Sequence, residues 1–389
     1  MNFKFTDEQM MIRDTAEAFL AKTSTSASVR QVMGTELGYD HQLWRRICDE
    51  MCWQEMHIPE VYGGLGLGYV ELVATLEQMG RYLCCSPFYA SVCLAANALL
   101  VAGTEHQKLT YLPQIAEGKT ATLAYTGESG GWDSSSVKVT YQKKGDSYRL
   151  NGSYRFVPDG HSAEILVLAA RDQDTQGDEG ISLFVVPANT PGISREWLPT
   201  MDQTRRQGQL QLDNLVLNSD AVMSDAGQAW LQLEKILDLG RIAVAAEQLG
   251  GSQQCLDSTL AYISERVQFG RSIASYQSVK HKCADMMVKV EAARSAVYYA
   301  ACVGDQFLNQ TTDVAGLAEA ASIAKSYSSD GFFHHAGVGI QLHGGVGITA
   351  EYDIQLYFKR AKSTETFLGA ADYHRERLAT LLLDTQVAL

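Results

Sequence analysis

ERVQFGRSIASYQSVKHKCADM, residues 265–286, is the stretch that decides the fold of this chain. A charged segment is interrupted at Gln268-Phe269-Gly270-Arg271, where the glycine permits a sharp turn. A helical pattern follows the turn. The whole stretch lies within residues 229–389, which read as three or four long amphipathic helices with few prolines. We therefore expect a helical bundle in the last third of the chain.

Outward from this stretch, residues 121–228 change to a strand pattern. SYRLNGSYRFV alternates apolar with polar residues and carries an Asn-Gly pair at Asn151-Gly152, which predicts a turn there. EILVLAARD and GISLFVVPA are short apolar runs bounded by breakers, and GQLQLDNLVL alternates again. Six or more short strands with polar turns predict a small barrel or sandwich.

Residues 1–120 return to helix. Thr6 with Gln9 three residues later forms a capping-box pattern before an apolar face. Helical spacing of apolar residues predicts a further helix at 70–82. The glycines of VYGGLGLG, residues 61–68, mark a loop before it. They lack the strand–turn–helix context of a dinucleotide-binding loop, so a Rossmann fold is not expected.

Composition narrows the function classes. The chain has 389 residues, 46% hydrophobic and 20% charged, which is ordinary for a globular protein of two or three domains. A net charge of −13 argues against nucleic-acid or membrane-surface binding. No apolar run approaches the roughly 20 residues that span a bilayer. The start, MNFKFTDEQ, lacks signal-peptide features, so a cytoplasmic protein is expected.

Cysteine and histidine spacing gives no metal site. The eight cysteines form no pair of CxxC units and are interpreted as reduced, mostly buried thiols. His334-His335 and His343 have no ligand-like partners in the sequence. The pair Arg205-Arg206 is interpreted as a solvated loop pair rather than a contact to a phosphate.

The 265–286 stretch closely resembles the carboxy-terminal signature of flavin-dependent acyl-CoA dehydrogenases. The order of helical, β and helical segments resembles this family over nearly the whole chain. The resemblance implies an α+β multidomain fold. Its parts are an amino-terminal helical domain at 1–120, a β domain at 121–228 and a carboxy-terminal four-helix bundle at 229–389. It also implies an FAD cofactor, an acyl-CoA thioester substrate and an oligomer.

Two parts of the FAD site keep the residues that the resemblance implies. The 265–271 turn resembles one that reaches across a subunit interface to the FAD of a neighbouring chain. QLHGGVGI, residues 341–348, resembles the glutamine and paired glycines near the adenine–ribose part of FAD, where glycine lets the backbone approach closely. The matching residues are Arg266, Gln268, Phe269, Gln277, Gln341, Gly344 and Gly345.

The flavin-ring part of the site departs from the family. TGESGGWD, residues 126–133, keeps Thr126 and the final aspartate, but Trp132 replaces the family's serine near the substrate. Further on, Phe156-Val157-Pro158 replaces a Trp-Ile-Thr or Trp-Ile-Ser run. Phe156 keeps an aromatic face beside the expected flavin, whereas Pro158 has neither a hydroxyl nor an N–H to donate. Thr126 and Phe156 are the cofactor contacts that remain.

Neither position that holds the catalytic base in the family carries a carboxylate here. The family's reaction needs a base to remove the α-proton of the thioester while the β-hydrogen leaves as hydride to the flavin. The usual glutamate lies in a Tyr-Glu-Gly-Thr loop, and the matching residues here are Phe367-Leu368-Gly369-Ala370. Some members place the base on a helix before an arginine, and that position here is Gly240, followed by Arg241.

Two other carboxylates are candidates for a substitute base. Glu247 follows Gly240 by seven residues on the same helix face, but two turns displace it by about 10 Å along the axis. Glu365 precedes Leu368 by three residues. Both are also compatible with surface or structural roles. The residues that match family substrate contacts are Asp238, Arg241 and Gly369.

These departures leave two main hypotheses. In the first, the chain is the non-catalytic subunit of a heteromeric acyl-CoA dehydrogenase, of the kind that shortens steroid side chains in bacteria, and a homologous subunit supplies the base. In the second, it is a self-sufficient homo-oligomeric flavoenzyme with an unusual base. A structural or regulatory protein without flavin is a third reading. The family usually passes its electrons to an electron-transfer flavoprotein, which is therefore an expected partner.

Overall fold

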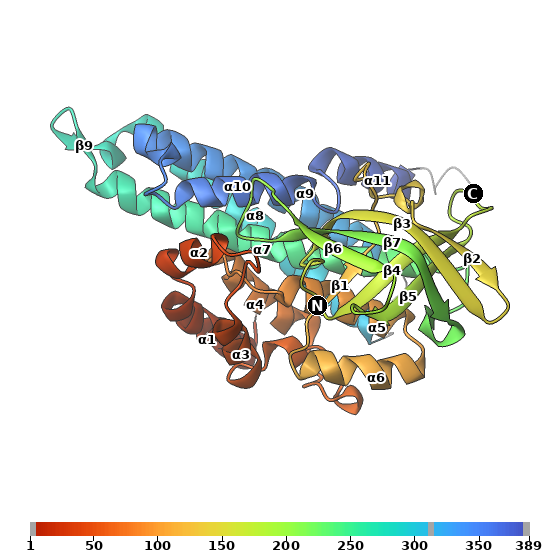
Figure 1. The fold of residues 1–389 in the computed structure, drawn as a ribbon. Coiled ribbons are helices and arrows are strands. Elements are labelled where there is room, and N and C mark those ends of the chain that lie inside the picture. Colours follow the sequence, from red (N-terminus) through yellow and green to blue (C-terminus); the bar gives the residue numbers. More distant parts are fainter. Residues whose placement is uncertain (1–4, 310–314, 384–389) are drawn as a thin grey trace. The chain divides into compact units, whose positions relative to one another are not determined.

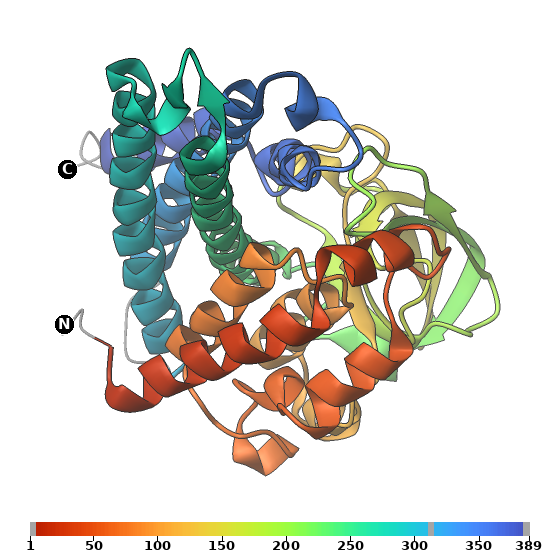
Figure 2. The same cartoon turned by 90° about the vertical axis from the view of Figure 1, so that its left-hand side faces the viewer.

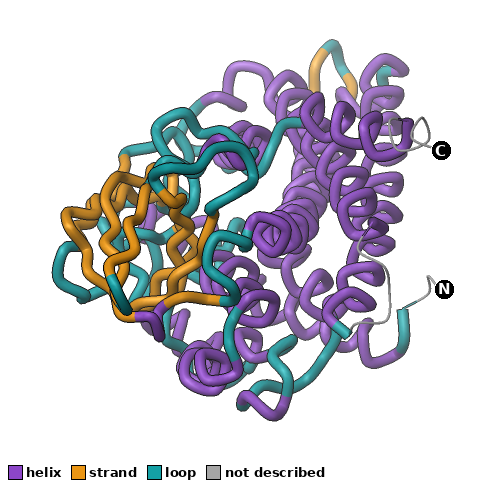
Figure 3. Tube along the Cα trace, turned by 90° about the vertical axis from the view of Figure 1, so that its right-hand side faces the viewer, coloured by secondary structure: helices purple, strands orange, loops and turns teal. Residues whose placement is uncertain are grey.

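The computed structural model describes residues 5–309 and 315–383, and the chain divides into two compact units (Figure 1). Unit 1 comprises Met1–Gln31, Tyr69–Cys84 and Arg241–Leu389. Unit 2 comprises Val32–Gly68 and Cys85–Gly240. Among the described strands, all except β9 (Val267–Gln268) and β10 (Arg271–Ser272) belong to unit 2, where Figure 3 shows them gathered.

An eight-stranded sheet forms the β part of unit 2, with strand order β6-β7-β3-β2-β4-β5-β8 and β1 paired parallel to β4. Its buried face holds a continuous apolar cluster that includes Tyr154, Leu168 and Phe184. The strands are β1 (Ala121–Ala124), β2 (Thr140–Lys144), β3 (Ser147–Pro158), β4 (Ile165–Asp172), β5 (Ile181–Pro187), β6 (Ile193–Leu198), β7 (Gln207–Asn218) and β8 (Val222–Met223).

The prediction of a turn at Asn151-Gly152 is wrong. Both residues lie inside β3, and the chain turns earlier, at Gly145, where φ is +60°. The pairing of β3 with β7 shifts register between Leu150 and Gly152 and again between Tyr154 and Val157. Gly152, at φ +132°, therefore lies in a β-bulge. A bulge, like a hairpin turn, often needs a backbone conformation that glycine adopts easily.

Helices precede this sheet in unit 2. A capping aspartate begins α3, and a buried π-helix, η3, packs against β1. The helices that lie wholly in this unit are α3 (His41–Asp49), η3 (Tyr89–Ala96), α5 (Asn97–Ala102) and α6 (Glu105–Ala116), with α2 (Ser26–Met33) at the boundary.

Unit 1 is helical. Thr6 and Gln9 form the predicted capping box at the start of α1, with both hydrogen bonds present. Figure 2 shows the long helices of this unit lying alongside one another, and α9 packs against α8, α10 and α11. The helices are α1 (Asp7–Thr23), α4 (Tyr69–Arg81), α8 (Gln277–Leu308), α9 (Ala315–His343), α10 (Ile354–Thr366) and α11 (Ala371–Leu383), while α7 (Trp230–Glu265) begins in unit 2 and ends here.

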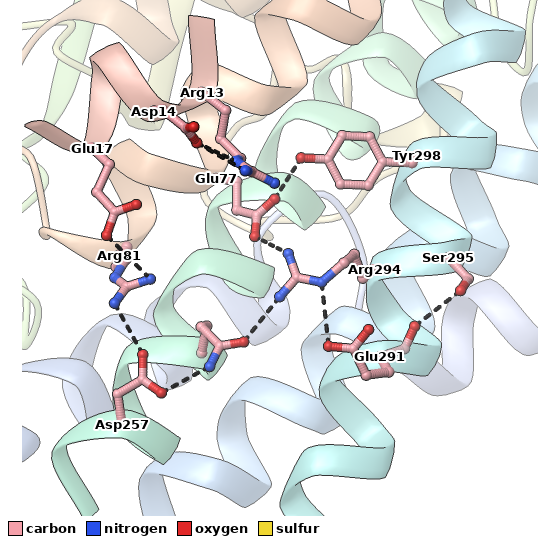
Figure 4. Close-up of polar contacts among 11 residues, drawn as sticks. Arg13, Asp14, Glu17, Glu77, Arg81, Asp257, Glu291, Arg294, Ser295 and Tyr298 are labelled. Atoms are coloured by element: carbon pink, nitrogen blue, oxygen red, sulfur yellow. Dashed lines mark hydrogen bonds and ion pairs between the residues drawn. The ribbon is translucent and has the colours of Figure 1, made fainter. Parts of the chain in front are cut away.

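Two glycines let α4 and α7 cross at very short range. A Cβ on Gly80 would overlap the carbonyl oxygen of Glu247, and a Cβ on Gly250 would overlap that of Glu77. The crossing is tied by a partly buried ion pair between Glu77 and Arg294 of α8, while the Tyr298 hydroxyl donates to the same carboxylate at 2.5 Å (Figure 4). Close backbone packing and this network therefore fix three helices together.

The order of elements confirms the predicted fold class of a helical domain, a β-sheet domain and a helical domain. The predicted helix at 70–82 is present as α4, and the alternating runs at 147–158 and 207–218 are β3 and β7. The domain boundaries near residues 120 and 228 stay a prediction.

Candidate functional site

The 265–271 turn is an exposed tip. After α7 ends at Glu265, β9 and β10 pair around Phe269 and Gly270, which both have positive φ, at +53° and +79°. The Phe269 ring is 92% exposed. The Tyr276 hydroxyl donates to the Gln268 carbonyl oxygen at 3.2 Å, which fastens the tip to the start of α8. A fully exposed phenyl on a well-formed turn is typical of contact with another molecule.

The 341–348 segment lies near the same end of unit 1. The Tyr262 ring stacks on His343 with centroids 4.3 Å apart, and its hydroxyl donates to the His343 carbonyl oxygen at 3.2 Å. Tyr262 precedes the tip arginine, Arg266, by four residues. Gly344, at φ +66°, and Gly345 have no neighbouring atom where a Cβ would stand, and Gln341 is exposed. The predicted adenine–ribose contacts therefore face open space.

Exposed apolar side chains surround this end of the bundle. Leu260 on α7, Val267 in β9 and Ile348 after α9 are 41%, 56% and 73% exposed. Gln277, the other predicted cofactor contact here, begins α8 and is exposed. Exposed apolar side chains on these three segments suit a covered interface.

The loop after α10 holds the residue that stands at the family's usual base position. Leu368 is 1% exposed and adopts a left-handed φ of +59°, which is uncommon for a residue with a Cβ. Its carbonyl oxygen accepts hydrogen bonds from Arg241 Nε at 3.1 Å and His374 Nε2 at 3.0 Å. Gly369, at φ +103°, has no room for a Cβ, which would lie 2.5 Å from the Tyr373 ring.

His374 is kept neutral in this loop. Its pKa is lowered to about 2, first by burial and then by the neighbouring charges of Arg241 and Lys325. Nε2 carries the proton that is donated to the Leu368 carbonyl, and Nδ1 lies 3.3 Å from the Ser322 hydroxyl. Arg241, a predicted substrate contact, is thus brought together with Leu368 and Gly369, and its Nε is engaged by the loop backbone.

The two candidate substitute bases are in different settings. The Glu365 carboxylate accepts from Lys362 Nζ at 2.6 Å and its side chain is 21% exposed. Glu247 is 6% exposed within α7, where its carbonyl packs against Gly80 at the α4 crossing. Both therefore have structural surroundings, and neither is shown to face a substrate.

In unit 2, the bulge of β3 presents Phe156. The residue has a φ of +58° and is 37% exposed, so the second register shift turns its ring out of the sheet. Thr126, which is buried, accepts a backbone hydrogen bond from Arg155 at its carbonyl. The Pro158 carbonyl accepts from Thr122 Oγ1 at 2.6 Å. These contacts join the segments that contain residues 122–126 and 155–158, while the roles of Thr126 and Phe156 as FAD contacts stay a prediction.

The 126–133 segment is locally ordered. Trp132 lies with its ring centroid 5.9 Å from that of Tyr125. Hydrogen bonds from Ser135 and Ser136 lower the pKa of Asp133, which begins a short helical turn. Asp133 therefore has a structural role in this loop.

Gly240 and Asp238 lie in the unit 2 part of α7. The Gly240 carbonyl accepts from the hydroxyl of Tyr89 at 2.9 Å, and the Arg205 guanidinium lies 4.6 Å from the centre of the Tyr89 ring. Tyr89 is 2% exposed, in the π-helix η3, and Asp238 is equally buried. A phenol therefore occupies the space beside the second base position.

The interpretation of Arg205-Arg206 as a solvated pair is wrong, because Arg205 is only partly exposed, with its Nη1 buried, and Arg206 is buried. Arg206 is 3% exposed, stacks 4.2 Å from the Trp197 ring and donates to the carbonyl oxygens of Met33 and Thr35. A guanidinium has five N–H donors and a flat apolar face, so it can cross-link loops from inside.

The structure adds three residues to the predicted set: Tyr89, Lys325 and His374. All three are buried. Tyr89 and Lys325 hold backbone carbonyls far away in sequence, whereas His374 holds the Leu368 carbonyl six residues before it, and no motif marks any of these contacts. Among the described residues, no three His, Cys, Asp or Glu side chains are grouped as a metal would need. Within the same described ranges, no helix combines the length and apolar character that crossing a bilayer requires.

Comparison with known proteins identifies the family of this chain and several similar proteins. Profiles of the acyl-CoA dehydrogenase N-terminal, middle and C-terminal domains match residues 6–119, 122–215 and 227–383, and the chain belongs to the acyl-CoA dehydrogenase family, whose members bind FAD. Acyl-CoA dehydrogenase IpdE2 of Mycolicibacterium smegmatis is 31% identical, covering 96% of this chain and 98% of its own.

Two solved structures share the fold. Butyryl-CoA dehydrogenase from Megasphaera elsdenii is 28% identical with a TM-score of 0.88, covering 98% of this chain and all of its own. The ChsE4-ChsE5 complex from Mycobacterium tuberculosis matches at 26% identity with a TM-score of 0.87, covering 98% and 99% of the two chains.

Proposed function

We propose that this chain is the non-catalytic subunit of a heteromeric, FAD-linked acyl-CoA dehydrogenase. The observation that carries the proposal is the contrast between the two parts of the family's site. Leu368 and Gly240 stand at the base positions without a carboxylate, while Phe269 is presented at 92% exposure on an ordered tip. The parts that would serve a neighbour persist, and the parts that would serve the chain's own chemistry do not.

The residues at the distal end of unit 1 fit FAD. Arg266, Gln268 and Phe269 would hold the cofactor of a neighbouring subunit, because their turn projects from the bundle. Gln341 with the paired glycines would hold the adenine–ribose part, since open space surrounds both glycines. When bound, FAD supplies the hydride acceptor of the family's dehydrogenation.

The flavin-ring end fits less well. Pro158 offers no N–H, and its carbonyl is engaged by Thr122. Phe156 presents an aromatic face but has no polar atom for the ring edge. Leu368, which matches the family's usual base position, is a buried apolar residue, and leucine cannot accept a proton.

One comparison supports a partner subunit. The ChsE4-ChsE5 structure, which shares this fold, is a complex of two named chains. The exposed apolar cluster around Leu260, Val267 and Ile348 suits burial against such a chain. The assembled enzyme would act on an acyl-CoA thioester in the cytoplasm and pass electrons to an electron-transfer flavoprotein.

Purification with and without a homologous partner tests the proposal. The chain is expressed alone and together with each acyl-CoA dehydrogenase homologue encoded beside it, and mass photometry follows assembly. We expect a stable complex with both chains and thioester oxidation only by that complex. A homo-oligomer that oxidises acyl-CoA after rigorous purification would overturn the proposal and favour a self-sufficient enzyme using Glu247 or Glu365. Absence of FAD from every form would favour a structural protein.

A further inference from the structure

A fully buried amine lies beside the loop that carries Leu368. Lys325, on α9, is 0% exposed. Its Nζ donates to the carbonyl oxygens of Thr364 at 3.0 Å, Glu365 at 3.2 Å and Gly369 at 2.9 Å, and to the Ser329 hydroxyl at 2.7 Å. Three backbone carbonyls from residues about forty positions away therefore converge on one side chain.

These carbonyls belong to the end of a helix and to the loop after it. Thr364 and Glu365 lie in the last turn of α10, where carbonyl groups have no partner within the helix. Such groups are usually satisfied by the next residues of the chain, and a cation near them is favourable. Here Lys325 supplies the hydrogen bonds from another helix, and Gln248 Nε2 donates to the Thr364 carbonyl as well, at 3.0 Å.

The same amine also holds the far side of the loop. Lys325 Nζ donates to the Gly369 carbonyl, beyond Leu368, as well as to the carbonyls at the end of α10 before it. The carbonyl of Leu368 itself accepts from Arg241 and His374. All the donors in this arrangement are side chains with little exposure. The path of the backbone at residues 364–369, including the left-handed φ of Leu368, is therefore set by buried donors from α7, α9 and α11.

The geometry also excludes a simpler role for Lys325 as the missing base. An ammonium group has three N–H donors, and four oxygens already surround this one. A base must instead direct a free lone pair at the proton that it removes. The Lys325 amine is already hydrogen-bonded to four oxygens, so its role is to hold the loop backbone in place.

We propose that Lys325 is the positioning residue of the 364–369 segment, holding the end of α10 and the Gly369 carbonyl in one arrangement and so fixing the backbone at the family's base position. The meaning of this positioning for the family's chemistry rests on the proposed function, because residues 367–370 match the loop that carries the base in other family members. The positioning itself depends on this chain alone.

The protonation state of the Lys325 amine provides a second, pH-dependent test of this proposal. Burial, followed by the charge of Arg241, lowers the pKa of Lys325 to about 7. The other charged or titratable groups that face it are Glu365 on α10, Asp330 on α9 and His374 on α11. A neutral amine has two N–H donors in place of three and carries no charge, so losing the proton removes one hydrogen bond from this cluster and weakens its hold on the carbonyls.

Hydrogen exchange read by mass spectrometry tests the positioning in the protein as purified. In Lys325→Met, the peptide covering residues 364–374 should exchange about tenfold faster, while peptides from α8 stay unchanged. Lys325→Gln keeps one N–H donor group, so exchange of this peptide should be faster than in wild type and slower than in Lys325→Met. If Lys325→Met fails to fold, Lys325→Gln takes its place. The matched control is Lys362→Met on the same helix end, because Lys362 is 48% exposed and contacts the Glu365 carboxylate and the Phe333 ring rather than the backbone of the loop.

The pH dependence and the flavin content give independent readouts. After correction for the intrinsic exchange rate, wild-type exchange of the 364–374 peptide should rise as pH passes about 7, and Lys325→Met should lack this step. Unchanged exchange in this peptide, or equal acceleration of every unit 1 helix, would overturn the proposal. A wild-type protein without FAD in any assembly would sink the proposed function, whereas the exchange result would still decide the role of Lys325.

Discussion

Acid should destabilise unit 1 through His374. The imidazole is 0% exposed and its pKa is lowered to about 2, against 6.5 for the ordinary group. Below about pH 6.5 the unfolded chain takes up a proton that the folded chain does not, so stability is present above that pH and is lost as the pH falls. From the two pKa values, the loss between about pH 7.5 and about pH 5 is about 2 kcal/mol.

The substitution His374→Gln isolates this contribution. Glutamine can still donate to the Leu368 carbonyl but does not titrate, so the variant should lose about 1–3 kcal/mol at neutral pH and show a pH dependence smaller by about 2 kcal/mol. Urea unfolding followed by far-ultraviolet circular dichroism reports the long helices of unit 1. His281→Gln removes an imidazole from an exposed position on α8 and is the control.

Tryptophan fluorescence separates the two units in the same experiment. All five tryptophans lie in unit 2, which contains the other strongly shifted histidine, His57, with a pKa lowered to about 4 by burial. The fluorescence transition should keep its acid sensitivity in His374→Gln, because His57 is unchanged. If the circular dichroism transition of the variant keeps the full wild-type pH dependence, the reasoning about His374 is refuted.

Three further predictions follow from the packing and the site. Gly250→Ala should lower the free energy of unfolding by more than about 2 kcal/mol in urea titrations, because a Cβ would overlap the Glu77 carbonyl and outweigh the helix propensity of alanine; wild-type stability would contradict the crossing. Phe269→Ala should leave the fold intact but weaken partner association about 30-fold in a binding titration, whereas Met201→Ala, at an exposed apolar position, should not. Leu368→Glu should not restore thioester oxidation to the isolated chain, because Pro158 is unchanged; bleaching of its flavin band would count against this reading.

The fold was predictable wherever the pattern is local. The capping box at Thr6, the helix at 70–82 and the alternating strands depend on neighbours in sequence, and the structure has all of them. Asn151-Gly152 misled because the backbone freedom of glycine serves a bulge as well as a turn. The choice between the two depends on the partner strand β7, which lies about sixty residues away.

The site was predictable only where a motif carries it. The tip at Phe269 and the glycines at 344–345 are built within one turn of chain, so a motif can mark them, and their contacts with FAD stay a prediction. Lys325 was missed because a lysine in a helix gives no sign of the distant carbonyls that it will hold. His374 was missed although the Leu368 carbonyl lies only six residues before it, because no motif marks that hydrogen bond. Arg206 was misjudged for the same reason, because the Trp197 ring and the Thr35 carbonyl that bury it come from other segments.

The most direct test of the central claim is a visible absorption spectrum, taken anaerobically before and after adding a panel of acyl-CoA thioesters. It is recorded on the chain alone and on the complex with its homologous partner. The account predicts that the chain alone is colourless or keeps its flavin band with every thioester, and that the complex carries FAD and is bleached by at least one. A flavin band near-stoichiometric with the isolated chain and bleached by a thioester would contradict it.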